Sequence, residues 1–142
     1  RDHGFNRDRH TYDLLANAGV EFVSDERDPE ALGPYSVASE TGSLVEVPLN
    51  TPPDHDHVDH GTYSPPAGWS DPFSGDVYTG TEWVERVLAG VERIDEQGGI
   101  ATVLAHPACM ALVEDFAQFD RLCEGLSAYE SLTIAEAGRR WA

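Results

Sequence analysis

The amino-acid sequence predicts an α/β fold, in which short strands alternate with amphipathic helices. The strongest indication is the run 98–105, where two glycines precede β-branched and small apolar residues that end at His106 and Pro107. This run is too short for a typical helix and is typical of a fully buried strand in a parallel sheet. Pro107 ends it because proline has no N–H to donate. His106 is therefore expected at the carboxyl end of a buried strand, where α/β folds place their chemistry.

The first 24 residues also follow an α/β order. Residues 1–5 are typical of a loop that leaves the end of a strand whose body lies before Arg1. Asn6 is a suitable N-cap for a helix over about 7–18, which Gly19 would end. The apolar run 20–24 then predicts a strand.

The middle of the chain contains most of the expected irregular structure. Residues 25–43 are polar and rich in proline and glycine, so a loop is predicted there, followed by a strand over 43–49. A long insert over about 50–78 is rich in Pro, Gly, Asp and His. Loops of this length are usually functional or disordered. Its aromatic residues favour an ordered loop folded over a binding cleft, namely Tyr63, Trp69, Phe73 and Tyr78.

The C-terminal part is predicted to be mainly helical. Thr79 and Glu82 form a capping-box pattern that begins a helix over about 80–97. A second helix is expected over about 114–126, with its phenylalanines in the core, then a short strand over 132–134 and a terminal helix over 135–142. The apolar face of the first helix is expected to hold Trp83, Val87, Leu88, Val91 and Ile94.

Composition excludes several function classes. The chain has 142 residues, 26 of them acidic against nine arginines and no lysine, and its net charge is −17. This charge argues against binding to nucleic acid or to an anionic membrane, and no apolar run is long enough for membrane insertion. A scattered acidic surface with arginine in place of lysine suggests adaptation to high salt. A cytoplasmic location is favoured, with secretion left open because a leader could precede Arg1.

The two cysteines, Cys109 and Cys123, lie beside apolar residues and are expected to be buried free thiols. A denser group of possible metal ligands is the string His-x-His-x-Asp-His at residues 55–60. It resembles the metal-binding signature of the metallo-β-lactamase superfamily, which implies zinc ions that activate water. In that fold a helix follows the signature, whereas Pro52-Pro53 before it and Gly61 to Pro66 after it predict that no helix starts here. The alternative ligand set is His55, His57, Asp59 and His60.

A second resemblance extends over almost the whole chain. The order of elements is similar to the C-terminal half of a polysaccharide deacetylase of the NodB-homology family, particularly its form in salt-adapted archaea. Arg1 before Asp2-His3-Gly4 is similar to the third motif of that family, without its proline, and Leu104-Ala105-His106 is similar to the fifth. The nearest candidates for the fourth motif are Trp69 and Asp71. The resemblance implies that residues 1–142 form part of a distorted (β/α)7 barrel with a long loop over about 50–78.

The same resemblance implies an activity, the metal-dependent hydrolysis of the N-acetyl amide of a carbohydrate. His106 would be the general acid, Arg1 would hold the basic aspartate, and Leu104 would line the pocket for the acetyl methyl group. Trp69 and Asp71 would contact the acetylated carbohydrate. The family binds a divalent metal, usually zinc, through an Asp-Asp pair and a His-x-x-x-His motif that do not occur in this sequence. These ligands are expected before residue 1, so the chain alone is expected to be inactive. A non-catalytic carbohydrate-binding module is the remaining alternative.

Overall fold

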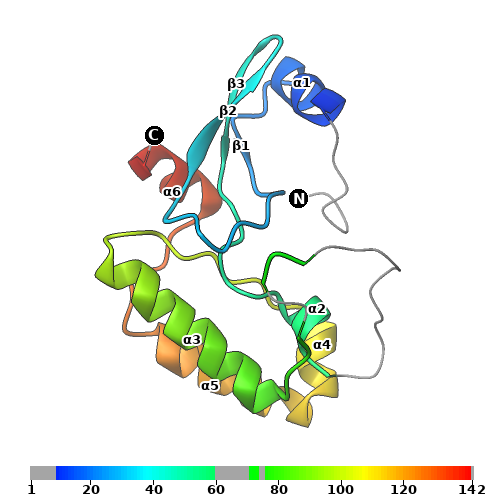
Figure 1. Cartoon of the computed structure of the whole chain (residues 1–142), viewed down its shortest axis with the longest axis vertical. Helices are drawn as coiled ribbons and strands as arrows, with labels where there is room; N and C mark the ends of the chain where they lie inside the picture. Colours follow the sequence, from blue (N-terminus) through cyan, green and yellow to red (C-terminus); the bar gives the residue numbers. More distant parts are fainter. Residues whose placement is uncertain (1–8, 60–70, 74–75, 142) are drawn as a thin grey trace.

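The computed structural model describes residues 9–59, 71–73 and 76–141. Arg1, His60 and Trp69 lie outside these ranges. Figure 1 shows a small sheet with one helix on either side, joined by extended segments to a group of four helices. The α/β class is therefore confirmed. The predicted barrel is not formed by the described residues, which contain one three-stranded sheet.

The sheet is built from β1 (Phe22–Val23), β2 (Tyr35–Ser39) and β3 (Gly42–Glu46), in the order β1-β3-β2. β1 runs parallel to β3, and β2 runs antiparallel to it. Helix α1 (Arg9–Asn17) packs on β2 and β3, while α6 (Ile134–Trp141) packs on β1. The helices predicted near both ends of the chain and the strands predicted near residues 22 and 45 are thus confirmed.

Residues 35–39 and 132–134 both differ from the predicted local structure. Residues 35–39 were expected in a loop but form β2, whose side chains alternate between half-buried and exposed positions. An edge strand of this kind needs little apolar character, because its hydrogen bonds to β3 hold it in place. Residues 132–134 form no strand. Thr133 instead caps α6, since its hydroxyl accepts from the N–H of Glu136 at 3.2 Å and the Glu136 carboxylate accepts from the N–H of Thr133 at 2.8 Å.

The run 98–105 is extended but forms no strand ladder, and residues 101–106 are half-buried. It was expected to be a fully buried strand. Side chains of the neighbouring segment replace the ladder. Asn50 donates from Nδ2 to the carbonyl oxygen of Ile100 at 3.0 Å and accepts from the N–H of Thr102 at 2.8 Å. The hydroxyl of Thr51 donates to the carbonyl oxygen of Thr102 at 2.7 Å. Residues 50–54 therefore run alongside residues 100–106 with the polar groups paired through side chains.

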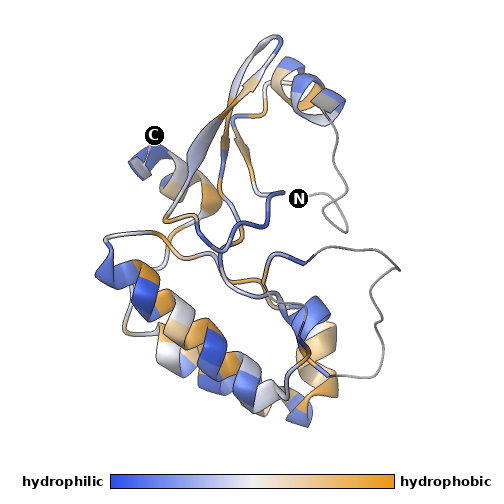
Figure 2. Cartoon of the chain, viewed as in Figure 1, coloured by the Kyte–Doolittle hydropathy of each residue, from blue (hydrophilic) through white to orange (hydrophobic). Residues whose placement is uncertain are grey.

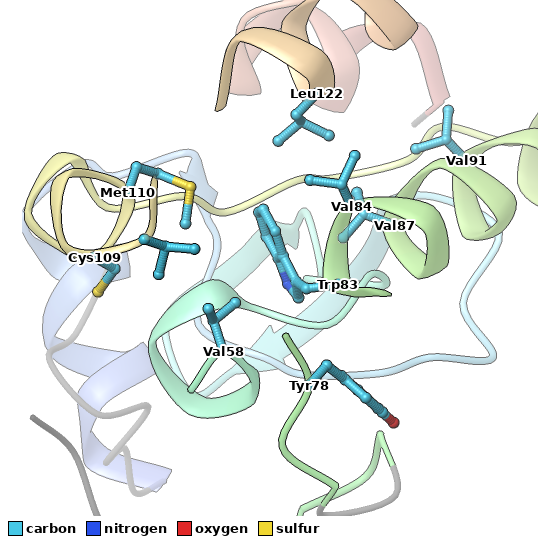
Figure 3. Packing of buried hydrophobic residues seen from close by; sticks show 10 residues of the cluster. Val58, Tyr78, Trp83, Val84, Val87, Val91, Cys109, Met110 and Leu122 are labelled. Atoms are coloured by element: carbon cyan, nitrogen blue, oxygen red, sulfur yellow. The ribbon is translucent and has the colours of Figure 1, made fainter. Parts of the chain in front are cut away.

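The main core lies among the helices. The predicted capping box of α3 (Gly80–Glu96) is present, and the predicted face is buried, apart from the half-buried Leu88. Figure 3 shows the Trp83 indole among side chains from α3, α4 (Pro107–Leu112) and α5 (Ala117–Leu126). Figure 2 shows polar and apolar residues alternating along α3, and the apolar ones Trp83, Val87, Val91 and Ile94 are buried. None of the helices in the described ranges combines the length and the apolar character that are needed to cross a bilayer.

Phe116 and Phe119 were expected in the core, but they lie outside it. Phe116 and Phe119 are 37% and 36% exposed. A short 3-10 helix, η2 (Glu114–Phe116), precedes α5, and all three of its residues have positive φ angles. Phe116 therefore lies outside the periodicity of α5. Gln118 and Leu122 form the buried side of α5, and Phe119 is one residue away from that side.

Candidate active site

Two distant segments meet at the end of the run 98–105. One ends at His106, and the other continues into α2 (Asp54–His57), a single helical turn. The expectation that no helix begins near Pro52-Pro53 is wrong. Pro53 occupies the N-cap position of α2 in an extended conformation. Proline is compatible with this position because the first N–H groups of a helix have no partner within it.

Asp54 is the central residue of this site. Its side chain is 0% exposed. Oδ1 accepts from the N–H of His55 at 2.8 Å and lies 2.6 Å from Nδ1 of His106. Oδ2 accepts from the N–H of His106 at 2.5 Å. The His106 side chain is 45% exposed, so a buried carboxylate fixes the imidazole through Nδ1 and leaves Nε2 as the nitrogen available to a substrate.

Cys109, in the first half of α4, lies against the same carboxylate. Burial, and secondarily the charge and hydrogen bond of Asp54, raise the pKa of the Cys109 thiol to about 11. The sulfur is 3.5 Å from Nδ1 of His55. The His55 and His106 rings have their centroids 5.5 Å apart. A sulfur, two imidazoles and a carboxylate therefore converge at the start of α2 and α4.

The two thiols are expected to react at very different rates. Both are free, but only Cys109 is buried, which corrects the expectation for Cys123. A thiol with a pKa of about 11 is roughly one part in a thousand thiolate at pH 8. Iodoacetamide should therefore label Cys123 more than about 100-fold faster than Cys109, as measured by peptide mass spectrometry over time. Labelling of both cysteines at similar rates in the folded chain would contradict the burial of Cys109.

A second polar cluster surrounds His57, the last residue of α2. Nδ1 of His57 is 2.9 Å from the carbonyl oxygen of Asp76, and its Nε2 is 3.1 Å from Oδ2 of Asp71. Nη1 of Arg27 lies 3.6 Å from Asp56 and 3.9 Å from Asp71. Burial raises the pKa of Asp56, and the charge of Arg27 partly offsets this effect. Both ring nitrogens of His57 face oxygen acceptors, so this cluster fastens the segment near Asp71 to α2.

The structure brings together only part of the predicted site. Leu104 lies two residues before His106, and its carbonyl oxygen accepts from the N–H of Asp54 at 3.4 Å. Asp71 lies beside His57 and Arg27. The alternative ligands are also separated, because His55 faces Cys109, His57 faces Asp71 and Asp59 is exposed.

Asp54 and Cys109 were missed in the sequence. The signal that could have identified Asp54 is its position. An acidic residue follows Pro52-Pro53 at the end of one extended run, as His106 ends another.

Within the described ranges, one group of three side chains could hold a metal ion. It consists of Asp54, His106 and Cys109, whose donor atoms lie within 4.8 Å of one another. The group does not fit the hydrolytic metal that the deacetylase resemblance implies. The resemblance implies an Asp-Asp pair and a His-x-x-x-His motif as the metal ligands, which differ from the Asp, His and Cys of this group, and it gives His106 the role of an acid.

No protein-family model and no curated protein matches this chain. A solved structure is similar to it, the crystal structure of a protein from Mycobacterium smegmatis that is described as a polysaccharide deacetylase. The two share 24% identity with a TM-score of 0.61, and the match covers 96% of this chain and 44% of the other. The chain thus spans less than half the length of that protein. At this identity the likeness shows the fold alone, and the chain has the fold of one part of a deacetylase-like α/β protein.

Proposed function

We propose that this chain is the C-terminal portion, over residues 1–142, of a metal-dependent carbohydrate N-deacetylase domain with a distorted (β/α)7 barrel. The observation that supports this best is the buried carboxylate of Asp54, 2.6 Å from Nδ1 of the partly exposed His106. A carboxylate in this position accepts from Nδ1–H of the imidazole and holds the ring in one orientation. The fold of the solved deacetylase-like protein agrees with this assignment.

Hydrolysis of an acetamide requires a proton for the departing nitrogen. When the C–N bond breaks, its electron pair remains on nitrogen, which takes a proton from Nε2 of His106 to leave as the amine. Asp54 keeps Nδ1 protonated and the ring aligned during this transfer. Polarisation of the carbonyl and activation of water are the chemistry that the resemblance assigns to a divalent metal, zinc, with ligands before Arg1.

The remaining site residues have supporting roles in this proposal. Leu104 is half-buried and immediately precedes the turn into the site, which suits an apolar contact with the acetyl methyl group. Arg1 would hold the basic aspartate, while Trp69 and Asp71 would contact the sugar. The high density of acidic residues is consistent with a protein adapted to high salt.

Acetate release from an N-acetylated oligosaccharide tests the proposal. The product of the complete reading frame that contains these residues should turn over in the presence of zinc, and the 142-residue chain alone should not. His106→Ala should lower kcat by about 10²–10⁴-fold with little change in KM, because a general acid acts mainly in the transition state. His10→Ala, an exposed histidine on α1, is the control and should leave the rate unchanged.

Two outcomes would contradict the proposal. Clear turnover by the 142-residue chain would refute the expectation that catalytic ligands lie before residue 1. An unchanged rate for His106→Ala would remove its role as the acid. Sugar binding that needs no metal and is accompanied by no turnover in the complete protein would favour a carbohydrate-binding module instead.

A further inference from the structure

We propose that Asp54, His55, His106 and Cys109 form a second metal site, one that binds a thiophilic divalent cation such as Zn²⁺ or Cd²⁺ and thereby occupies the catalytic histidine. This site would be distinct from the hydrolytic metal. Its four donors come from the start of α2 and from the turn into α4. A sulfur, two imidazole nitrogens and a carboxylate oxygen are the ligand types of four-coordinate zinc.

The distances support a tetrahedral site. At zinc bond lengths of about 2.3 Å to sulfur and about 2.0 Å to nitrogen, two ligand atoms in a tetrahedron lie roughly 3.5 Å apart. Sγ of Cys109 and Nδ1 of His55 are 3.5 Å apart. The donor atoms of Asp54, His106 and Cys109 lie within 4.8 Å of one another. Two adjustments are needed. Asp54 and His106, now 2.6 Å apart, must separate, and the 45% exposed His106 side chain can move outward to allow this. The half-buried His55 ring, which lies outside the 4.8 Å group, must also move closer to Asp54 and His106.

Burial determines how a cation would reach this site. Asp54 and Cys109 are buried, whereas His55 and His106 are half-buried, so the cation would enter from the histidine side. The sulfur ligand favours zinc and cadmium over magnesium and calcium, which prefer oxygen ligands. On binding, the S–H bond of Cys109 breaks, a sulfur–metal bond forms, and the proton leaves to solvent. Neutral His106 binds through Nδ1, and its proton moves to Nε2.

Occupation of the site would remove the acid described above. A cation on Nδ1 would replace the hydrogen bond that Nδ1 donates to Asp54. The neutral ring would then keep only its Nε2 proton, and loss of that proton would leave an imidazolate, which is too unfavourable for a general acid. Excess zinc would therefore inhibit the deacetylase. This consequence rests on the proposed function, whereas binding of the cation does not.

Titration of the chain with Cd²⁺ under reducing conditions, with no added histidine tag, tests binding directly. We expect an ultraviolet thiolate-to-cadmium band that saturates at one equivalent. Cys109→Ser should abolish the band, and Cys123→Ser, the matched control at the other cysteine, should retain it. His106→Ala and His55→Ala should each weaken binding by at least about tenfold, since even residues outside the ligand shell contribute that much. His60→Ala should have no effect.

Absence of the band in the wild-type chain would overturn the proposal, as would its persistence in Cys109→Ser or its loss in Cys123→Ser. Circular dichroism reports whether each variant folds. If Cys109→Ser is unstable, His106→Ala and His60→Ala still decide between this site and the cluster at residues 55–60, because each of them changes only one of the two. Cadmium binding without amidase activity in the complete protein would refute the proposed function and leave the metal site standing. Zinc-dependent activity that excess zinc does not inhibit, together with no cadmium band, would refute the second metal site and leave the proposed function standing.

Discussion

Asp54→Asn is expected to lower the free energy of unfolding by about 3 kcal/mol and to release the His106 ring. The carboxylate is completely buried and accepts three N–H groups, two from backbone and one from the ring. The amide that replaces it must turn its NH₂ group toward one of those donors. A buried donor then faces another donor, and each loses its hydrogen bond.

Urea denaturation measures the stability change, and proton NMR measures the effect on the ring. The Nδ1 proton of His106 lies in a 2.6 Å contact, so a far-downfield resonance is expected in the wild-type chain and not in Asp54→Asn. Asp59→Asn is the matched control, because Asp59 is exposed and lies in the same segment. It should change stability by less than about 0.5 kcal/mol. A variant at Asp54 that is as stable as the wild-type chain and keeps the resonance would contradict the proposed pairing.

The features predicted correctly are those that depend on residues close together in sequence. The capping box at Thr79 and the buried face of α3 follow from spacings of three and four residues. A capping box at Thr133 is equally local, but residues 132–134 also match the pattern of a short strand. The two patterns overlap, and local spacing alone does not decide between them.

The features that were missed depend on contacts between distant residues. β2 is a strand because β3 lies beside it, and its own residues carry little strand signal. His106 was identified as a candidate, but Asp54 contacts it across a sequence separation of 52 residues. Only the parallel course of residues 50–54 and 100–106 brings the two together. That course depends in turn on the side chains of Asn50 and Thr51, which replace a strand ladder.

Trp83→Ala is expected to have the largest effect on stability, a loss of about 3–5 kcal/mol. The indole is completely buried at the centre of the helical core. A loss of this size is a large fraction of the stability of an ordinary domain, so the variant should be partly unfolded at room temperature. Thermal and urea denaturation followed by circular dichroism would measure it.

Trp83→Phe separates the contribution of packing from that of a hydrogen bond that connects the core to the site. Nε1 of Trp83 donates to the carbonyl oxygen of Pro52 at 2.9 Å, two residues before Asp54. Phenylalanine keeps an aromatic ring but leaves that carbonyl without the indole donor, which should cost about 1–3 kcal/mol. Because Pro52 leads directly into α2, the downfield resonance of His106 should also weaken. Trp141→Phe, at a tryptophan that is 41% exposed, should cost less than about 1 kcal/mol. Equal effects of the two phenylalanine variants, on stability and on the resonance, would show that Trp83 does not hold the Asp54 segment in position.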